Sequence, residues 1–125
     1  MKPIQKAAFD VEISQARALM SRGDLESAFV HLERAHVIGQ SHVVPHVVAH
    51  WLMLIIALRQ KLYIAAWGQV VRIVFGAVGS AVDAVPLGNT GGSNISMFKR
   101  MHIEPDLLDI IEGRAPNESL QGRRP

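Results

Sequence analysis

Five of the six histidines in this 125-residue chain lie within twenty consecutive residues, and only His102 lies elsewhere. An imidazole can bind a metal ion, transfer a proton near neutral pH or form a buried hydrogen bond. The clustering therefore makes this segment the first candidate for chemistry. The clustered residues are His31, His36, His42, His46 and His50.

Three of these histidines, His42, His46 and His50, follow one another at intervals of four residues. On an α-helix this spacing places them on one face, with neighbouring Cβ atoms about 5–6 Å apart. His46 and His50 form the His-x-x-x-His pair that binds zinc in metalloproteases. In that motif a glutamate follows the first histidine and acts as the general base, whereas this chain has Val47. The pair therefore predicts metal binding and argues against peptidase activity.

A second ligand pair, Glu33 and His36, has the Glu-x-x-His spacing found on the helices of carboxylate-bridged di-iron bundles. Only about five residues connect the two predicted helices that carry the pairs, so we expect these helices to be antiparallel neighbours. One Glu-x-x-His pair supplies only half of a di-iron ligand set. We therefore expect a mixed nitrogen and oxygen site formed by Glu33, His36, His46 and His50, with His42 at the turn as a further candidate ligand.

The chain contains no cysteine, which excludes thiolate ligands and disulfides. Imidazole and carboxylate ligands suit Zn²⁺, Fe²⁺, Ni²⁺ or Cu²⁺, and haem is a less favoured cofactor. His31 lies about 140° around its helix from His36. We therefore expect His31 to be exposed to solvent, away from the site.

Three functions fit this pattern. The first is metal handling or sensing through the glutamate and histidine cluster. The second is a tetratricopeptide-like protein-interaction module in which the histidines are structural. The third is a metal-dependent enzyme, which needs an open coordination position and a general base. The third is the weakest, because the first carboxylate after Glu33 in the sequence is Asp83.

Helices must position these residues. Apolar spacing predicts helices over residues 10–20, 25–38, 42–59 and 62–82, and a short helix over 105–111. Asp24 and Ser41 are the expected N-caps of the second and third helices. The chain is therefore predicted to be all-α, a small bundle of about four helices followed by a glycine-rich loop and a short C-terminal segment.

The first two predicted helices resemble a tetratricopeptide hairpin in the placement of their small residues, among them Ala18, Gly23, Ala28 and Ala35. The period of about 34 residues does not recur, so we expect one hairpin and not a repeat array. Residues 1–112 are predicted to form a single domain. Residues 113–125 are polar, contain two prolines and are predicted to be a disordered tail.

The formal net charge of +2 is too small to indicate a nucleic-acid partner. Charge is nevertheless unevenly distributed, because no aspartate or glutamate lies between Glu33 and Asp83. The predicted helices over residues 42–82 are therefore apolar around most of their circumference and must be buried on several sides. In so small a chain we expect a second subunit to help bury them, which predicts a homodimer.

No segment has the length expected of a membrane span. The longest uninterrupted apolar run is Trp51–Leu58, eight residues, whereas a transmembrane helix needs about 20. The first ten residues lack the apolar stretch of a secretory signal. A cytoplasmic location is the resulting expectation.

The loop Gly88-Asn89-Thr90-Gly91-Gly92 lacks the Lys-Ser/Thr ending of a Walker loop and the spacing of a dinucleotide-binding motif. We therefore expect a tight turn and not a phosphate site. Folded back over the hairpin, Asn89, Thr90 and Asn94 are candidates to hydrogen-bond the metal-binding imidazoles.

Three strings occur together in this chain: Leu32-Glu33-Arg34-Ala35-His36, then Pro45-His46 with His50-Trp51, then Gly88-Asn89-Thr90-Gly91-Gly92. Their combination resembles a bacterial family of short helical proteins that is defined only as a domain of unknown function. The resemblance covers roughly residues 9–108. It implies a small helical protein in which Glu33, His36, His46, His50 and the glycine loop belong to one site, and it implies no substrate.

Overall fold

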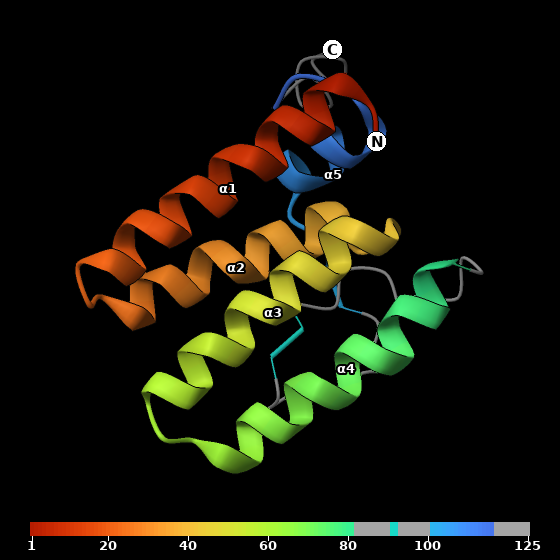
Figure 1. Ribbon diagram of the computed structural model, residues 1–125. Helices are drawn as coiled ribbons and strands as arrows, with labels where there is room; N and C mark the ends of the chain where they lie inside the picture. The colour runs from red at the N-terminus through yellow and green to blue at the C-terminus, as the bar shows by residue number, and fades with distance from the viewer. Residues whose placement is uncertain (82–90, 93–100, 117–125) are drawn as a thin grey trace.

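The computed structural model describes residues 1–81, 91–92 and 101–116. Within these residues the chain is all-helical, which confirms the predicted fold class (Figure 1). The helices are α1 (Pro3–Ser21), α2 (Leu25–Gly39), α3 (Val43–Arg59), α4 (Tyr63–Ala81) and α5 (Pro105–Glu112).

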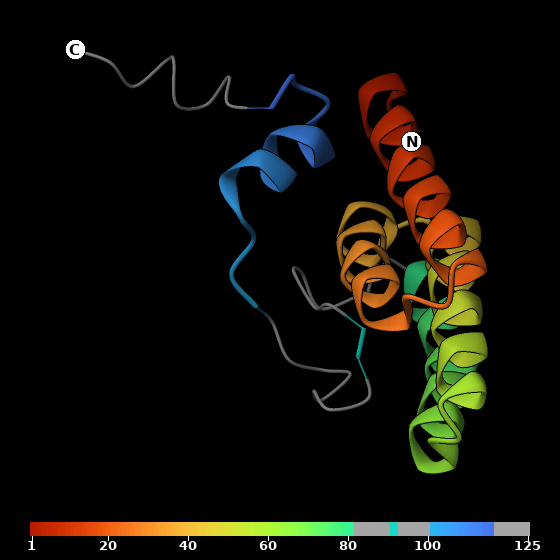
Figure 2. The ribbon, with the colours of Figure 1, turned by 90° about the vertical axis from the view of Figure 1, so that its left-hand side faces the viewer.

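The first four helices run back and forth, each beside the next one in the chain (Figure 1). Helix α2 is central, since it packs against α1, α3 and α5, and Figure 2 shows it between α5 and α3. Among the described helices, α4 packs against α3 alone. No helix in the described part of the chain is long and apolar enough to cross a membrane.

The start of α2 follows the predicted capping chemistry. The Asp24 carboxylate accepts a hydrogen bond from the backbone N–H of Ser27 at 3.2 Å, which satisfies a donor that the helix itself leaves unpaired. Gly23, just before it, has φ = +78°, a left-handed conformation that favours glycine. The turn between α1 and α2 is therefore determined by two consecutive residues, Gly23 and Asp24.

Two helix starts differ from the predictions. Helix α1 begins at Pro3 and not near residue 10, because the buried position in its first turn is taken by Gln5, whose amide donates to the carbonyl of Ile38 at 2.8 Å. A polar residue on the buried face hides the apolar periodicity there. The N-cap of α3 is His42 and not Ser41, and its side chain makes no capping hydrogen bond.

The hydrophobic core lies between α1, α2, α3 and α5. Helix α1 contributes residues at helical intervals, and the partner helices supply small residues where the backbones approach and larger ones elsewhere. Met53, adjacent to the histidine face of α3, is fully buried and belongs to this core. The core includes Phe9, Ile13, Ala16, Met20, Ala28, Leu32, Ala35, Leu52, Ile56, Leu107 and Ile110.

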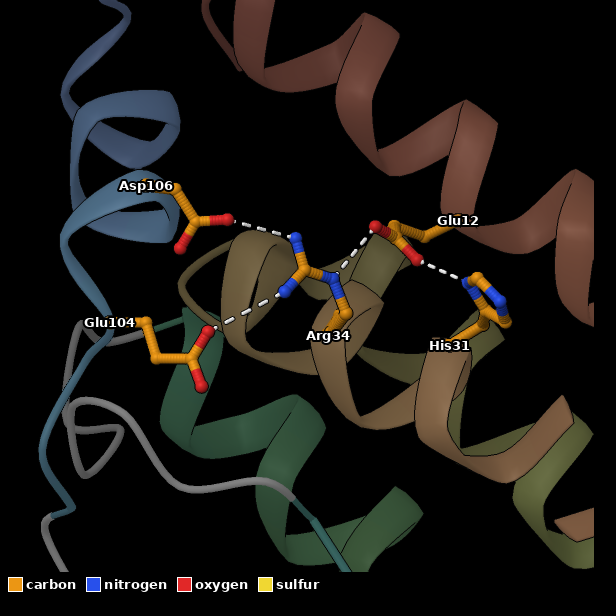
Figure 3. Close-up of polar contacts among 5 residues, drawn as sticks. All are labelled: Glu12, His31, Arg34, Glu104 and Asp106. Atoms are coloured by element: carbon orange, nitrogen blue, oxygen red, sulfur yellow. Dashed lines mark hydrogen bonds and ion pairs between the residues drawn. The ribbon is translucent and has the colours of Figure 1, made fainter. Parts of the chain in front are cut away.

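Arg34 joins α1, α2 and α5 through its guanidinium (Figure 3). Its Nε donates to Glu12 at 2.9 Å, and its terminal nitrogens lie 3.1 Å from Asp106 and 3.6 Å from Glu104. The second oxygen of Glu12 accepts from Nδ1 of His31 at 2.7 Å. The prediction that His31 is solvent-exposed is therefore wrong: its side chain is 33% exposed and is held by the one acidic residue that α1 turns toward it.

We predict that Arg34→Met lowers the free energy of unfolding by about 1–2 kcal/mol, because it leaves the half-buried carboxylates of Glu12 and Asp106 without their cation. Urea denaturation followed by circular dichroism measures the change. Lys6→Met is the matched control. It removes an ion pair with Asp10 whose side chains are 64% and 57% exposed, and it should cost less than about 0.5 kcal/mol. Equal losses in the two variants would contradict a specific role for Arg34.

Candidate metal centre

Three imidazoles meet between α2 and α3. They come from His36 on α2 and from His46 and His50 on α3, with ring centroids 4.6–4.9 Å apart. Their exposed fractions are only 3%, 4% and 1%. One possible ligand atom from each residue lies within 4.8 Å of the other two. We call this set, His36, His46 and His50, the histidine triad.

Helix geometry accounts for this meeting. His46 and His50 are one turn apart on α3, so their side chains share the face that the i, i+4 spacing predicts. His36 lies in the last turn of α2, and the short connection that follows folds α3 back beside it. The three rings are therefore brought together by one helical hairpin.

The backbone of that hairpin fixes the tautomer of His46. Its Nδ1 lies 2.9 Å from the carbonyl oxygen of Gln40, the residue that caps the end of α2. A carbonyl can only accept, so Nδ1 carries the hydrogen and Nε2 carries the lone pair. A metal ion requires that lone pair.

His50 is oriented in the same way by a side chain of α4. The amide nitrogen of Gln69 donates to the carbonyl oxygen of Gly91 at 3.1 Å, which fixes the amide so that its oxygen faces His50. That oxygen lies 2.7 Å from Nδ1 of His50, so Nδ1 donates and Nε2 again carries the lone pair. Histidines that ligate metals are commonly held by such a hydrogen bond from the other ring nitrogen.

Two glycines give the triad its space. A Cβ added at Gly76 of α4 would overlap Nε2 of His46. A Cβ added at Gly91 would lie 2.9 Å from the ring of His36 and 3.0 Å from the ring of His50, and Gly91 has φ = +83°. The absence of side chains at these positions leaves a cradle beside the ring atoms. Gly76 therefore allows α4 to pack closely against the ring of His46.

Burial keeps His46 and His50 of the triad neutral. The pKa of His50 is lowered to about 4, chiefly by desolvation and with a smaller contribution from the charge of Arg72, while the hydrogen bond to Gln69 acts in the opposite direction. Desolvation also lowers the pKa of His46, although its hydrogen bond to Gln40 acts in the opposite direction. At neutral pH both imidazoles are therefore uncharged and able to donate an electron pair.

Residues 4–111 match the family described as protein of unknown function, DUF3703. The chain belongs to the DUF3703 family. This confirms the family resemblance seen in the sequence. The matched residues include the whole histidine triad and the whole of α4. Neither the curated proteins nor the solved structures gave a match to the chain.

Not every predicted ligand of this DUF3703 protein lies in the triad. Glu33 is outside the group of ligand atoms; it is half-buried and borders a groove that Val30, Val37 and His102 also line. Helical periodicity rotates Glu33 about 60° from His36, which is enough to direct its carboxylate to this groove. Burial raises the pKa of Glu33, and placing the carboxylate deeper would cost more desolvation.

His42 is also outside the triad, because as the N-cap of α3 it has an extended backbone and does not follow the helical i, i+4 rule. His102 is exposed. The predicted supporting residues Asn89, Thr90 and Asn94 lie outside the described residues.

Sequence reasoning did not identify Gln40, Gln69 or Gly76 as parts of the site in this DUF3703 chain. Gln69 left a recognisable signal, a single amide within a largely apolar helix, which indicates a buried polar partner. Gln40 acts through its backbone carbonyl, so its residue type carries no signal. Gly76 belongs to the site because it leaves room for the ring of His46. Such a contact is seen only in the tertiary fold, so the glycine alone carries no signal in the sequence.

We predict that Gly76→Ala destabilises the protein by about 1–2 kcal/mol. Alanine favours a helix over glycine by about 1 kcal/mol, but the added methyl group overlaps the ring of His46, and overpacking of this kind costs about 1–3 kcal/mol. A double-mutant cycle with His46→Ala tests the cause. Removing the ring should abolish the penalty, and additive effects of the two substitutions would contradict the proposed contact.

We also predict that acid destabilises the metal-free protein through His50. Its pKa is about 4 when folded and about 6.5 when unfolded, so between these values the unfolded state binds the extra proton. The free energy of unfolding therefore falls as the pH drops through this window, with His50 contributing on the order of 1 kcal/mol per pH unit. Urea denaturation in the presence of a chelator at several pH values measures this slope. His50→Gln should have a shallower slope, and an unchanged slope would refute the assignment.

Proposed function

We propose that this protein binds one transition-metal ion through His36, His46 and His50. The observation that carries the proposal is the meeting of three buried imidazoles whose ligand atoms lie within 4.8 Å of one another. An imidazole can bind a metal ion only while it is neutral, and burial favours the neutral ring. A bound cation would use the lone pairs of the three rings.

The dimensions of the triad support this use. Two nitrogens bound to one tetrahedral zinc ion lie about 3.4 Å apart, because each bond is about 2.1 Å long. The ligand atoms of the triad lie within 4.8 Å of one another, so the rings would move closer by up to about 1.4 Å to reach this distance. The cradle beside Gly76 and Gly91 borders the rings that would move.

The hydrogen bonds around the triad also support metal binding. Gln40 and Gln69 each accept from an Nδ1 atom, which turns the lone pairs of His46 and His50 to their Nε2 atoms. Such partners commonly account for a 10- to 100-fold part of metal affinity. Three imidazoles without a thiolate suit Zn²⁺, Cu²⁺, Ni²⁺ or Fe²⁺.

Metal handling or sensing is the role that this ligand set favours. Three protein ligands leave at least one coordination position of a tetrahedral ion for water, an anion or another ligand. Hydrolytic chemistry would also need a general base at the ion. Among the described residues, no carboxylate joins the triad, so a carrier or sensor fits better than an enzyme.

We predict that protein purified without an affinity tag binds one equivalent of at least one of these four ions. Calorimetric titration and elemental analysis after gel filtration measure the stoichiometry. At a metal concentration one hundred times the Kd, binding stabilises the folded state by about 2.7 kcal/mol, which should raise the Tm by roughly 10 °C.

His46→Gln should lose this binding, since glutamine keeps a polar side chain but has no imidazole. His102→Gln is the matched control, because His102 is exposed and outside the triad. The control should bind as the wild type does. Absence of stoichiometric metal, together with an unchanged Tm for all four ions, would refute the proposed function.

A further inference from the structure

The hairpin of α3 and α4 exposes an extensive apolar surface. Its members are between 49% and 91% exposed and come from both helices. We call this surface the outer face. It consists of Val44, Trp51, Leu58, Tyr63, Ile64, Trp67, Val74, Phe75 and Val78.

The outer face of α4 has the spacing of a coiled-coil seam. Ile64, Trp67, Val74 and Val78 of this face, together with the half-buried Val71, are separated by three, four, three and four residues. This alternation aligns them along one side of a helix and is the pattern by which a helix packs into a second helix. The stripe therefore favours a helical partner.

Helix α3 carries the same pattern. Val44, Val47, Trp51, Leu54 and Leu58 follow the identical three and four spacing, and Val44, Trp51 and Leu58 are among its exposed residues. Since α3 and α4 run side by side (Figure 1), the hairpin presents two such stripes. Two stripes on adjacent helices match the surface that one half of a four-helix bundle shows to the other half.

The area of the outer face is that of a dimer interface. Aromatic side chains bury about 150–250 Å² each, so Trp51, Tyr63, Trp67 and Phe75 offer roughly 500 Å². With the aliphatic members the total exceeds about 800 Å², the area that each partner buries in a standard interface. The largest exposed apolar patch of a typical monomer is about 300–600 Å².

We propose that the outer face binds the outer face of a second copy of this chain, so that two α3–α4 hairpins form a four-helix bundle about a twofold axis. In a twofold interface the same surface of each copy faces the other. A charged residue near the axis would therefore lie opposite the same charge on the second copy. The outer face avoids such a pairing of like charges, because none of its members is charged.

A second copy fits this surface better than a lipid surface does. Helices that lie on membranes carry many lysines or arginines on their polar side. In α4 the only charged residue is Arg72, which is partly buried. The alternating three- and four-residue spacing also allows the side chains to interlock with those of another helix. Contact with lipid chains does not require this spacing.

We expect the wild-type protein to have twice the mass of the chain when light scattering is measured after gel filtration at micromolar concentration. Trp67→Glu and Val74→Glu should reduce that mass by half, because each places two charges in the buried interface of the dimer. Val30→Glu is the matched control. Val30 lies on α2 and is 57% exposed, close to the 58% of Val74, and its substitution should leave the mass unchanged.

A crosslinking measurement covers the case in which the glutamate variants fail to fold. The chain has no cysteine, so Val71→Cys introduces a single thiol at mid-length of α4, near the expected twofold axis. Mild oxidation should convert it to a covalent dimer much faster than Val30→Cys. A monomeric wild type, or equal crosslinking of the two variants, would overturn the proposal. Flotation of a monomeric wild type with phosphatidylglycerol vesicles would assign the face to lipid instead.

Discussion

Burial of three imidazoles is the constraint on which the arrangement of this molecule depends. Each ring has two nitrogens, and a buried nitrogen without a partner costs free energy. The backbone carbonyl of Gln40, at the end of α2, accepts a hydrogen bond from Nδ1 of His46, and the side-chain oxygen of Gln69 in α4 accepts one from Nδ1 of His50. Gln69 in turn reaches the carbonyl of Gly91. The triad therefore connects α4 and Gly91 to the hairpin of α2 and α3, whereas α4 packs on α3 alone among the described helices.

The sequence was sufficient to predict most of the fold. Apolar spacing located the helices, and Asp24 with Gly23 located the turn between the first two, because capping and left-handed backbone depend on local residue types. The start of α1 was not predictable in this way. Gln5 interrupts the apolar pattern, and its buried position is favourable only because the carbonyl of Ile38, far along the chain, accepts its amide. Local periodicity has no access to such a partner.

The candidate site also combines features that the sequence could predict with features that it could not. The intervals among His36, His46 and His50 are local, and the short connection between their helices makes the meeting of the rings predictable. The position of Glu33 was not, because a rotation of about 60° around α2 decides between the triad and a neighbouring groove. Gln69 and Gly76 belong to a helix that is distant in sequence, so their contacts follow from how α4 lies on α3. The family match spans these residues without assigning them a role.

Among the described helices, α4 packs on α3 alone, and it brings Gln69 and Gly76 to the triad. In the proposed metal complex all three ligands would come from α2 and α3, whereas the rate at which the ion leaves would also depend on how often α4 lifts away in a local opening. A surface that clamps the back of α4 would lengthen the residence time of the ion without touching a single ligand.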